Sequence, residues 1–258
     1  MKQRINFLGI EIDPLTMEET LDRVSEIVDK REITQHVVIN VAKLVYTQKD
    51  AKLKNIINSC GLINVDGAGV ILGAKFLGIK FPERVTGIDL MQNLVAYSSE
   101  KEYKIYFLGA KEEVVSKIVN DYKKIYPNLN IAGYRNGYFS SEEEDKVAED
   151  IKNSGADILF VAMGSPKKEI FINKFIQKMQ VPFVMGVGGS FDVVSGKIKR
   201  APLWMQKLYL EWFFRLIQEP KRMWKRYLVT NTKFAFLLLK EFLAYVMYPI
   251  RLVLNNDG

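Results

Sequence analysis

Cysteine and histidine are almost absent from this chain of 258 residues, which has one of each. The single cysteine, Cys60, excludes an internal disulfide and fits a reducing compartment. We expect it to be a small core residue, because nothing near it in the sequence would stabilise a reactive thiolate. Metal ligands are equally scarce, since His36 is expected to pack at a strand end and the acidic run 142–145 is typical of a solvated helix start. The sequence therefore does not favour a divalent-metal site built mainly from side chains.

Long apolar runs are missing too. The first 15 residues contain no apolar stretch of the kind that a signal peptide needs. Near the end, "FAFLLL" and "FLAYVMYPI" are separated by Lys240 and Glu241, and neither approaches the roughly 18 residues of a membrane-spanning helix. We expect a cytoplasmic protein that does not cross a membrane, and contact with a membrane surface remains open.

What is present, over the first 195 residues, is a regular alternation of short apolar runs with longer amphipathic segments. Several of the short runs are apolar on both faces, as buried parallel strands are. This alternation predicts an α/β core, residues 1–195, with a doubly wound parallel sheet flanked by helices. The expected strands are residues 36–41, 62–66, 104–109, 130–134, 157–164 and 182–188.

The remaining residues, 196–258, differ in character and form a predicted helical appendage. Residues 201–258 contain nine Lys and Arg against four acidic residues, so they carry most of the net charge of +7. The segment is rich in Leu, Trp, Tyr and Phe, and we expect two or three helices, broken at Pro220 and near Pro249. Interleaved aromatic and basic residues are typical of a helix on an anionic lipid surface, but a helical hairpin packed on the sheet or on a partner subunit fits equally well.

The basic stretch "EPKRMWKRY", residues 219–227, also raises the possibility of nucleic-acid binding. The nearly neutral core and the apolar character of the appendage speak against it, so we expect no nucleic-acid partner. A dinucleotide site is disfavoured as well. The glycines of residues 67–73 are spaced one residue too far apart for the fingerprint, and Asp89 lies in a predicted helix instead of ending a strand.

Polar or glycine-rich residues follow four of the predicted strands, where ligands bind in open parallel sheets. They are Asn40 and the segments 65–69, 164–169 and 186–192. Asp66 comes directly after an apolar strand and before a glycine, which suits either a general base on a rigid element or a cap for the next helix. A diphosphate bound here would be neutralised by Arg and Lys, which the appendage supplies together with Arg84, Lys199 and Arg200.

Four blocks of sequence resemble the WecG/TagA/CpsF family of bacterial glycosyltransferases, namely residues 63–90, 106–139, 158–169 and 186–228. The resemblance implies a Rossmann-like core with a helical C-terminal appendage that associates with the inner face of the cytoplasmic membrane. It further implies an inverting transfer, without a metal or other cofactor, of N-acetylmannosamine or a related sugar from its UDP form. The acceptor would be N-acetylglucosaminyl-diphospho-undecaprenol, and the product would serve teichoic acid linkage units or related surface polymers.

The resemblance also assigns roles to residues. Asp66, in the family's Asp-Gly motif, would be the base, Arg84 would bind substrate, and Arg215, Arg222 and Arg226 would bind the diphosphate, with Lys225 as a substitute. From their places after the strands, we further expect Asn40 to orient the sugar or the acceptor, and Gly164, Gly188 and Gly189 to line the nucleotide pocket.

Two positions depart from the family pattern. Val38 stands where a threonine is common, and Lys168 stands where a glutamine is usual. Both changes would alter which groups are recognised, and Lys168 makes a carboxylated donor such as UDP-N-acetylmannosaminuronate plausible. Another UDP-hexose, or a non-catalytic membrane scaffold that keeps nucleotide-sugar binding, remain as alternatives. The apolar surface of the appendage would also allow a homo-oligomer.

Overall fold

The computed structural model describes residues 2–254, without the side chains of Arg222 and of residues 245–254. Its centre is a parallel sheet of six strands in the order β4-β3-β8-β7-β5-β6, so the predicted α/β class and all six predicted strands are confirmed. Strands β5, β7 and β8 are fully buried, which explains their continuous apolar sequences. The strands are β3 (Thr34–Ile39), β4 (Leu62–Val65), β5 (Ile105–Gly109), β6 (Ile131–Arg135), β7 (Ile158–Ala162) and β8 (Phe183–Gly186).

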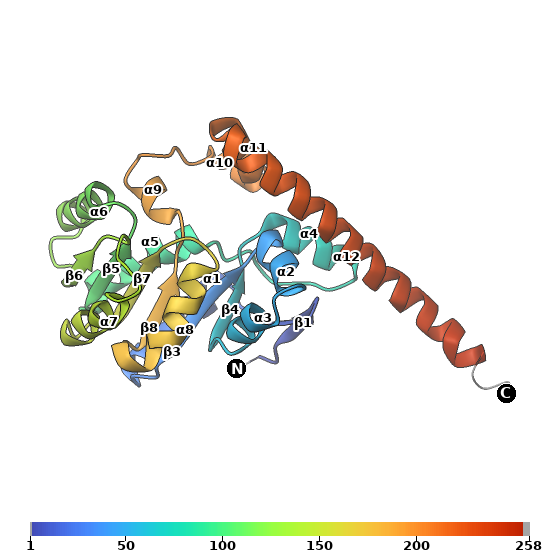
Figure 1. The fold of residues 1–258 in the computed structure, drawn as a ribbon, viewed down its shortest axis with the longest axis horizontal. Coiled ribbons are helices and arrows are strands. Elements are labelled where there is room, and N and C mark those ends of the chain that lie inside the picture. The colour runs from blue at the N-terminus through green and yellow to red at the C-terminus, as the bar shows by residue number, and fades with distance from the viewer. Residues whose placement is uncertain (1, 255–258) are drawn as a thin grey trace.

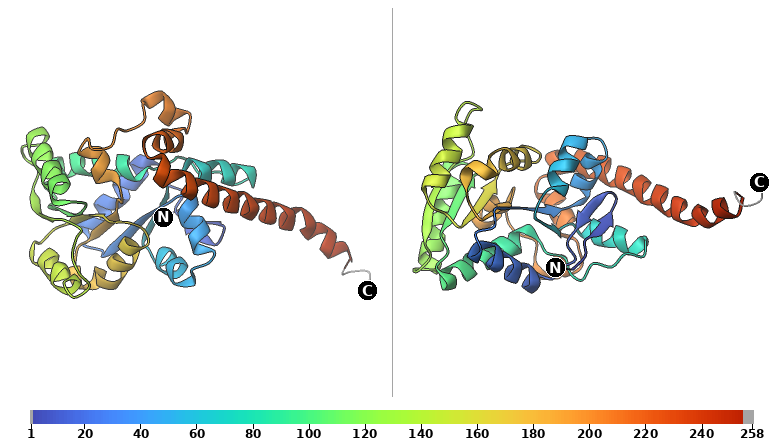
Figure 2. Two further views of the ribbon diagram at one scale, coloured as in Figure 1. Left: turned by 45° about the horizontal axis from the view of Figure 1, so that its top comes forward. Right: turned by 90° about the horizontal axis from the view of Figure 1, so that it is seen from below.

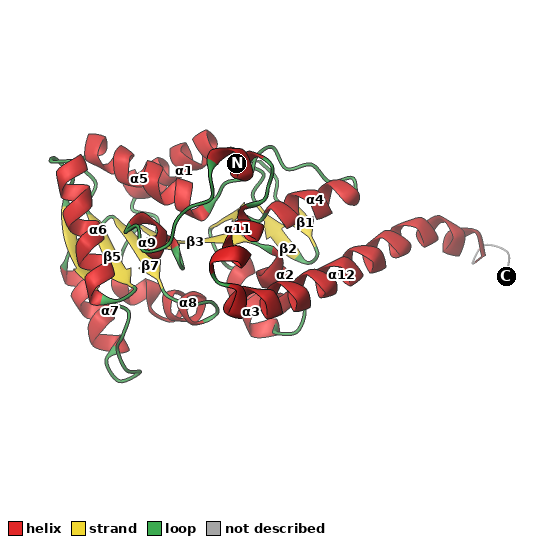
Figure 3. Cartoon of the chain, turned by 90° about the horizontal axis from the view of Figure 1, so that it is seen from above, coloured by secondary structure: helices red, strands yellow, loops and turns green. Residues whose placement is uncertain are grey.

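Helices cover both faces of this sheet (Figure 3). One face packs against α1 (Met17–Asp29), α5 (Gly87–Lys101), α6 (Glu112–Ile125) and the short α9 (Ser190–Val194). The other face packs against α7 (Glu144–Asn153) and α8 (Lys167–Met179), with α3 (Ala51–Asn58) beside α8 and α2 (Val41–Thr47) beside α3. The helices bury their apolar stripes in these two layers, so the polar loops after the strands are left at the carboxyl edge.

A small hairpin precedes the sheet and was not predicted from the sequence. Strands β1 (Ile5–Phe7) and β2 (Ile10–Ile12) are antiparallel, and both turn residues, Leu8 and Gly9, have positive φ, as tight hairpin turns require. The next residue, Asp13, pairs with the outer strand β4: its N–H donates to Ile63 O at 2.9 Å, and its carboxylate accepts from Ile63 N–H at 2.8 Å. The hairpin and Asp13 thus cover an otherwise exposed sheet edge.

The C-terminal helices are α10 (Leu203–Lys207), α11 (Glu211–Gln218) and α12 (Pro220–Leu254). Pro220 begins α12, as predicted, because a proline fits the first helical turn. The predicted break near Pro249 is wrong. The 35-residue helix continues through that position, since a long helix can lose one backbone hydrogen bond and stay continuous.

Helix α12 is about 50 Å long at 1.5 Å per residue, and its first half packs on the core. It contacts α2, and Phe234 enters the apolar cluster formed by the hairpin, α2, α3 and α4 (Ala68–Phe76). The second half extends away from the core (Figures 1 and 2). Within residues 2–254, no helix combines the length and the apolar character needed to cross a membrane.

Candidate active site

Asp66 and Asn40 lie side by side at the carboxyl edge of the sheet. The N–H groups of Asp66 and Gly67 both donate to Ile39 O, at 3.0 and 3.1 Å, which ties the end of β4 to the end of β3. A Cβ on Gly67 would lie 2.9 Å from Asn40 Cα. The side chain of Asn40 caps α2 by accepting from Lys43 N–H at 3.1 Å. Gly67, not Asp66, occupies the N-cap of α4, so Asp66 does not serve as the helix cap that the sequence left open.

The Asp66 carboxyl group is partly buried among charged side chains from three parts of the chain. Burial raises the pKa of Asp66 above its ordinary value, Arg84 opposes this, Glu211 adds to it, and Arg215 and Lys43 oppose it. The net effect is a raised pKa, which makes the carboxylate a stronger base. The structure thus places Arg84 and Arg215, two of the residues expected to bind substrate, near Asp66, together with Lys43 and Glu211, which the sequence analysis did not single out.

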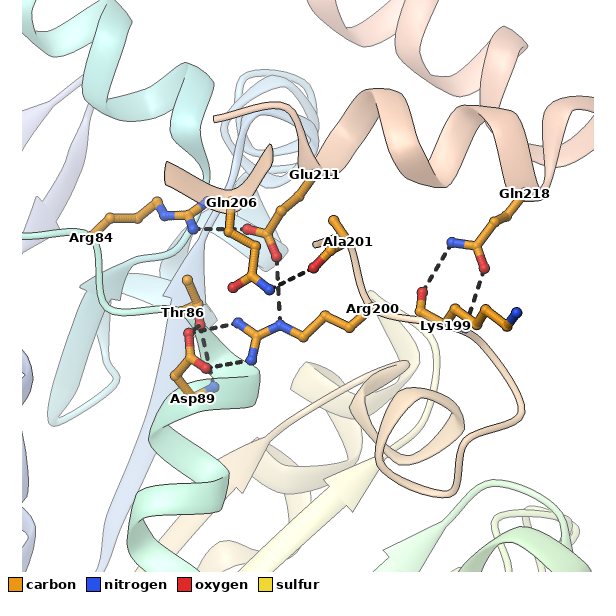
Figure 4. A network of polar contacts seen from close by, with 9 residues as sticks. All are labelled: Arg84, Thr86, Asp89, Lys199, Arg200, Ala201, Gln206, Glu211 and Gln218. Carbon is orange, nitrogen blue, oxygen red and sulfur yellow. Dashed lines mark hydrogen bonds and ion pairs between the residues drawn. The ribbon is translucent and has the colours of Figure 1, made fainter. Parts of the chain in front are cut away.

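A charge network joins the C-terminal helices to the core (Figure 4). Glu211, at the start of α11, pairs with Arg84 at 2.8 Å and with Arg200 at 3.7 Å. Arg200 also donates to both oxygens of Asp89, at 2.6 and 2.8 Å, and Asp89 N–H donates to Thr86 at the N-cap of α5. Arg200, expected to be a free cation for a diphosphate, is therefore committed to protein carboxylates.

A second charge cluster lies buried beneath the strand ends. Glu169 accepts ion pairs from Lys168 at 2.7 Å and from Lys43 at 3.0 Å, and Lys43 also donates to Val38 O at 2.8 Å. Burial lowers the pKa of Lys168 to about 8. Burial alone would raise the pKa of Glu169, but the two lysine charges outweigh it and lower the pKa to about 2. Lys168 thus has its ammonium group buried on Glu169, whereas the sequence predicted that it would face the sugar.

The other predicted residues are spread along the same edge. A Cβ on Gly164, Gly188 or Gly189 would meet nothing within 4 Å, so these glycines border open space after β7 and β8. Arg226 lies close enough to Lys168 to lower its pKa, and Lys225 is exposed on α12. The side chain of Arg222 lies outside the described residues.

A hollow of about 450 Å³ lies at the loop after β6 and the start of α8, where it is lined by residues 137–140, Glu143 and Lys167. It is close to the point between β5 and β7 where the strand order reverses, the usual ligand position in such sheets. Among the described residues, no three His, Cys, Asp or Glu side chains gather as metal ligands would.

The match to known proteins covers both the core and most of the C-terminal helices. Residues 5–246 match the model of the glycosyl transferase WecG/TagA/CpsF family. The chain belongs to this family. The resemblance inferred from the sequence is thereby confirmed, and the chain is a glycosyltransferase.

Two curated relatives are similar over the same number of residues. The chain is 38% identical over 193 residues to the N-acetylglucosaminyldiphosphoundecaprenol N-acetyl-beta-D-mannosaminyltransferase of Bacillus subtilis (strain 168), which covers 75% of this chain and 74% of the relative. It is 36% identical, with the same coverage, to the protein of the same name from Bacillus spizizenii (strain ATCC 23059 / NRRL B-14472 / W23).

Within this glycosyltransferase, the residues missed by sequence reasoning are Lys43, Glu169 and Glu211. Each is charged and at least three-quarters buried in an ion pair. The only local signal was a charge inside an apolar stretch: Lys43 in "NVAKLV", Glu169 in "KKEIFI" and Glu211 in "YLEWFF". Buried charges of this kind require a partner. Lys168 is next to Glu169 in the sequence, but the pairs Lys43–Glu169 and Arg84–Glu211 join residues that lie far apart in it.

Proposed function

We propose that this glycosyltransferase moves N-acetylmannosamine from UDP-N-acetylmannosamine to N-acetylglucosaminyl-diphospho-undecaprenol, with inversion and without a metal ion. The names of the two relatives support the sugar and the acceptor. The observation that carries the chemistry is Asp66, a carboxylate with a raised pKa at a rigid strand end, next to Arg84 and Arg215. This pairing of a base with nearby cations suits the deprotonation of an alcohol beside a departing diphosphate.

The mechanism is a single displacement. The Asp66 carboxylate takes the proton of the acceptor hydroxyl as its oxygen attacks the anomeric carbon from the face opposite UDP. The new glycosidic bond forms while the bond between the anomeric carbon and the phosphate oxygen breaks, and UDP leaves with that electron pair. Arg215 and Arg226 supply positive charge where the diphosphate charge develops, a role typically worth about 3 kcal/mol or more of barrier. Asn40, fixed as the cap of α2, orients the sugar or the acceptor.

The C-terminal helices would hold the enzyme against the inner face of the membrane, where a polyprenyl acceptor resides. Leu203 of α10 and Leu208 directly after it are 73% and 62% exposed, and Trp204 of α10 is 59% exposed. Exposed apolar and tryptophan side chains beside lysines are typical of interfacial helices. The same apolar surface would be covered equally well by self-association, which is the alternative.

The test is UDP release from UDP-N-acetylmannosamine with a short-chain N-acetylglucosaminyl-diphospho-lipid, in the presence of EDTA, for the wild type and Asp66→Asn. We expect release that is lost in the variant, while UDP binding by calorimetry persists in both. Release that depends on added metal would refute the metal-free mechanism. Release with the uronate donor alone would refute the choice of N-acetylmannosamine. The burial of Lys168 on Glu169 disfavours this outcome, because Lys168 is then not available to pair with the uronate carboxylate. UDP binding without turnover of either donor would support a non-catalytic scaffold.

A further inference from the structure

Glu211 is shared by two arginines, Arg84 of the α/β core and Arg200 of the loop that leads to the C-terminal helices. It is 25% exposed, and its two oxygens point to Arg84 on one side and Arg200 on the other (Figure 4). Arg84 is further fixed by the ring of Tyr209, 5.5 Å from its guanidinium carbon. Arg200 is held by Asp89 at the start of α5. Glu211 of α11 therefore lies between Arg84 and Arg200, which together form a cationic socket around its carboxylate.

The socket lies next to Asp66. Among the described residues, the charged groups that act on Asp66 include Arg84 from the loop before α5, Glu211 and Arg215 from α11, Lys43 from α2, and Arg200 from the loop before α10. Four of these five are cations, which favour the ionised carboxylate and weaken it as a base. Glu211 is the single anion among these five residues, and it raises the pKa of Asp66, whereas the cations lower it.

We propose that Glu211 is a positioning residue of the sugar transfer, which holds the Arg84 guanidinium in place and offsets its charge so that Asp66 remains an effective base. This rests on the proposed role of Asp66 in the transfer. Glu211 and Arg215 are on the same helix. When α11 docks, it therefore brings both Glu211, the anion that keeps Asp66 basic, and Arg215, a cation for the leaving diphosphate. Turnover is thereby linked to the docked position of α11, through a residue that does not touch the reacting atoms.

The experiment replaces Glu211 by Gln, which keeps the size and a hydrogen-bond acceptor but removes the charge. The pKa of Asp66 is measured by ¹³C NMR on protein labelled at aspartate carboxyl carbons, with the signal assigned by its loss in Asp66→Asn. We expect the pKa to fall by several tenths to about one pH unit, and kcat to fall roughly two- to five-fold because a weaker base accepts a proton less readily. KM should change little, and Glu211→Asp, which keeps the charge, should restore the titration.

The matched control is Gln218→Ala. Gln218 lies on the same helix and binds the backbone of Lys199 through two hydrogen bonds, at 3.2 and 3.0 Å, so its removal loosens α11 without changing the charge near Asp66. An unchanged Asp66 titration in Glu211→Gln would overturn the inference. An equal fall in Gln218→Ala would also overturn it, because loosened docking would then explain the effect. If the wild type releases no UDP yet the titration shifts, the electrostatic link stands and the proposed function fails.

Discussion

Replacing Lys168 by methionine should make the protein more stable at neutral pH, although it removes an ion pair. The side chain is 6% exposed and its pKa is lowered from 10.5 to about 8. At 1.36 kcal/mol per pKa unit, keeping this ammonium charged in the fold costs roughly 3 kcal/mol. That cost already includes the attraction of Glu169, which keeps its other partner, Lys43, at 3.0 Å. Methionine fills a similar volume, so we expect a gain of about 1–3 kcal/mol at pH 7.

The pH dependence follows from the same shift. Between pH 8 and 10.5 the unfolded chain binds more protons at Lys168 than the folded chain does, so the free energy of unfolding of the wild type rises with pH in this window. From pH 7 to 9.5 the rise from this residue is about 2 kcal/mol. Lys168→Met lacks this contribution, so the two proteins should become more alike in stability as the pH increases.

Urea unfolding at pH 7.0 and 9.5, followed by circular dichroism, measures both effects. Lys52→Met, on an exposed position of α3, controls for the general effect of replacing a lysine and should leave the wild-type slope with pH unchanged. A Lys168→Met protein less stable than the wild type at pH 7 would refute the reasoning. So would a difference between the two proteins that does not shrink at pH 9.5.

The remaining predictions concern three other parts of the molecule. Glu169→Gln leaves two buried ammonium groups without their carboxylate and should lower the free energy of unfolding by about 3–5 kcal/mol, measured by urea unfolding. Gly67→Ala places a Cβ 2.9 Å from Asn40 Cα and should lower kcat at least about ten-fold by displacing the site, with the melting temperature showing whether the fold is kept. Replacing Trp204 and Leu208 by serine should reduce cosedimentation with anionic vesicles several-fold without changing UDP release from a soluble acceptor analogue.

The sheet could be predicted because its information is local. Parallel strands buried on both faces are apolar at every position, as in "ILFVA" of β7, and that pattern needs no knowledge of the neighbours. The three-residue strands β1 and β2 are too short to show any period, and they are joined to β4 through the hydrogen bonds of Asp13. Pro249 was misjudged because a local preference was given more weight than the continuity of a long helix.

In the candidate site, too, only the features with a local sequence signal could be predicted. Asp66, Asn40 and the glycines follow strands, so the topology alone brings them to one edge. The pairs Lys43–Glu169 and Arg84–Glu211 are set by packing between distant segments, and no spacing in the sequence encodes them. Local patterns therefore identify which residues lie at the edge of the sheet, but not which charges neutralise them: Lys168 was expected to bind substrate, and it pairs with Glu169.

The strand order fixes the distance between two parts of the candidate site. Asp66 follows the outer strand β4, Gly188 and Gly189 follow β8, and only β3 lies between these strands. Neighbouring strands are about 4.8 Å apart, so the ends of β4 and β8 are separated by roughly 10 Å. Backbone hydrogen bonds between the strands fix this separation, and side-chain substitutions do not alter it. We therefore expect a change of donor sugar to arise from the side chains along this edge, because the separation of the strand ends is set by the sheet.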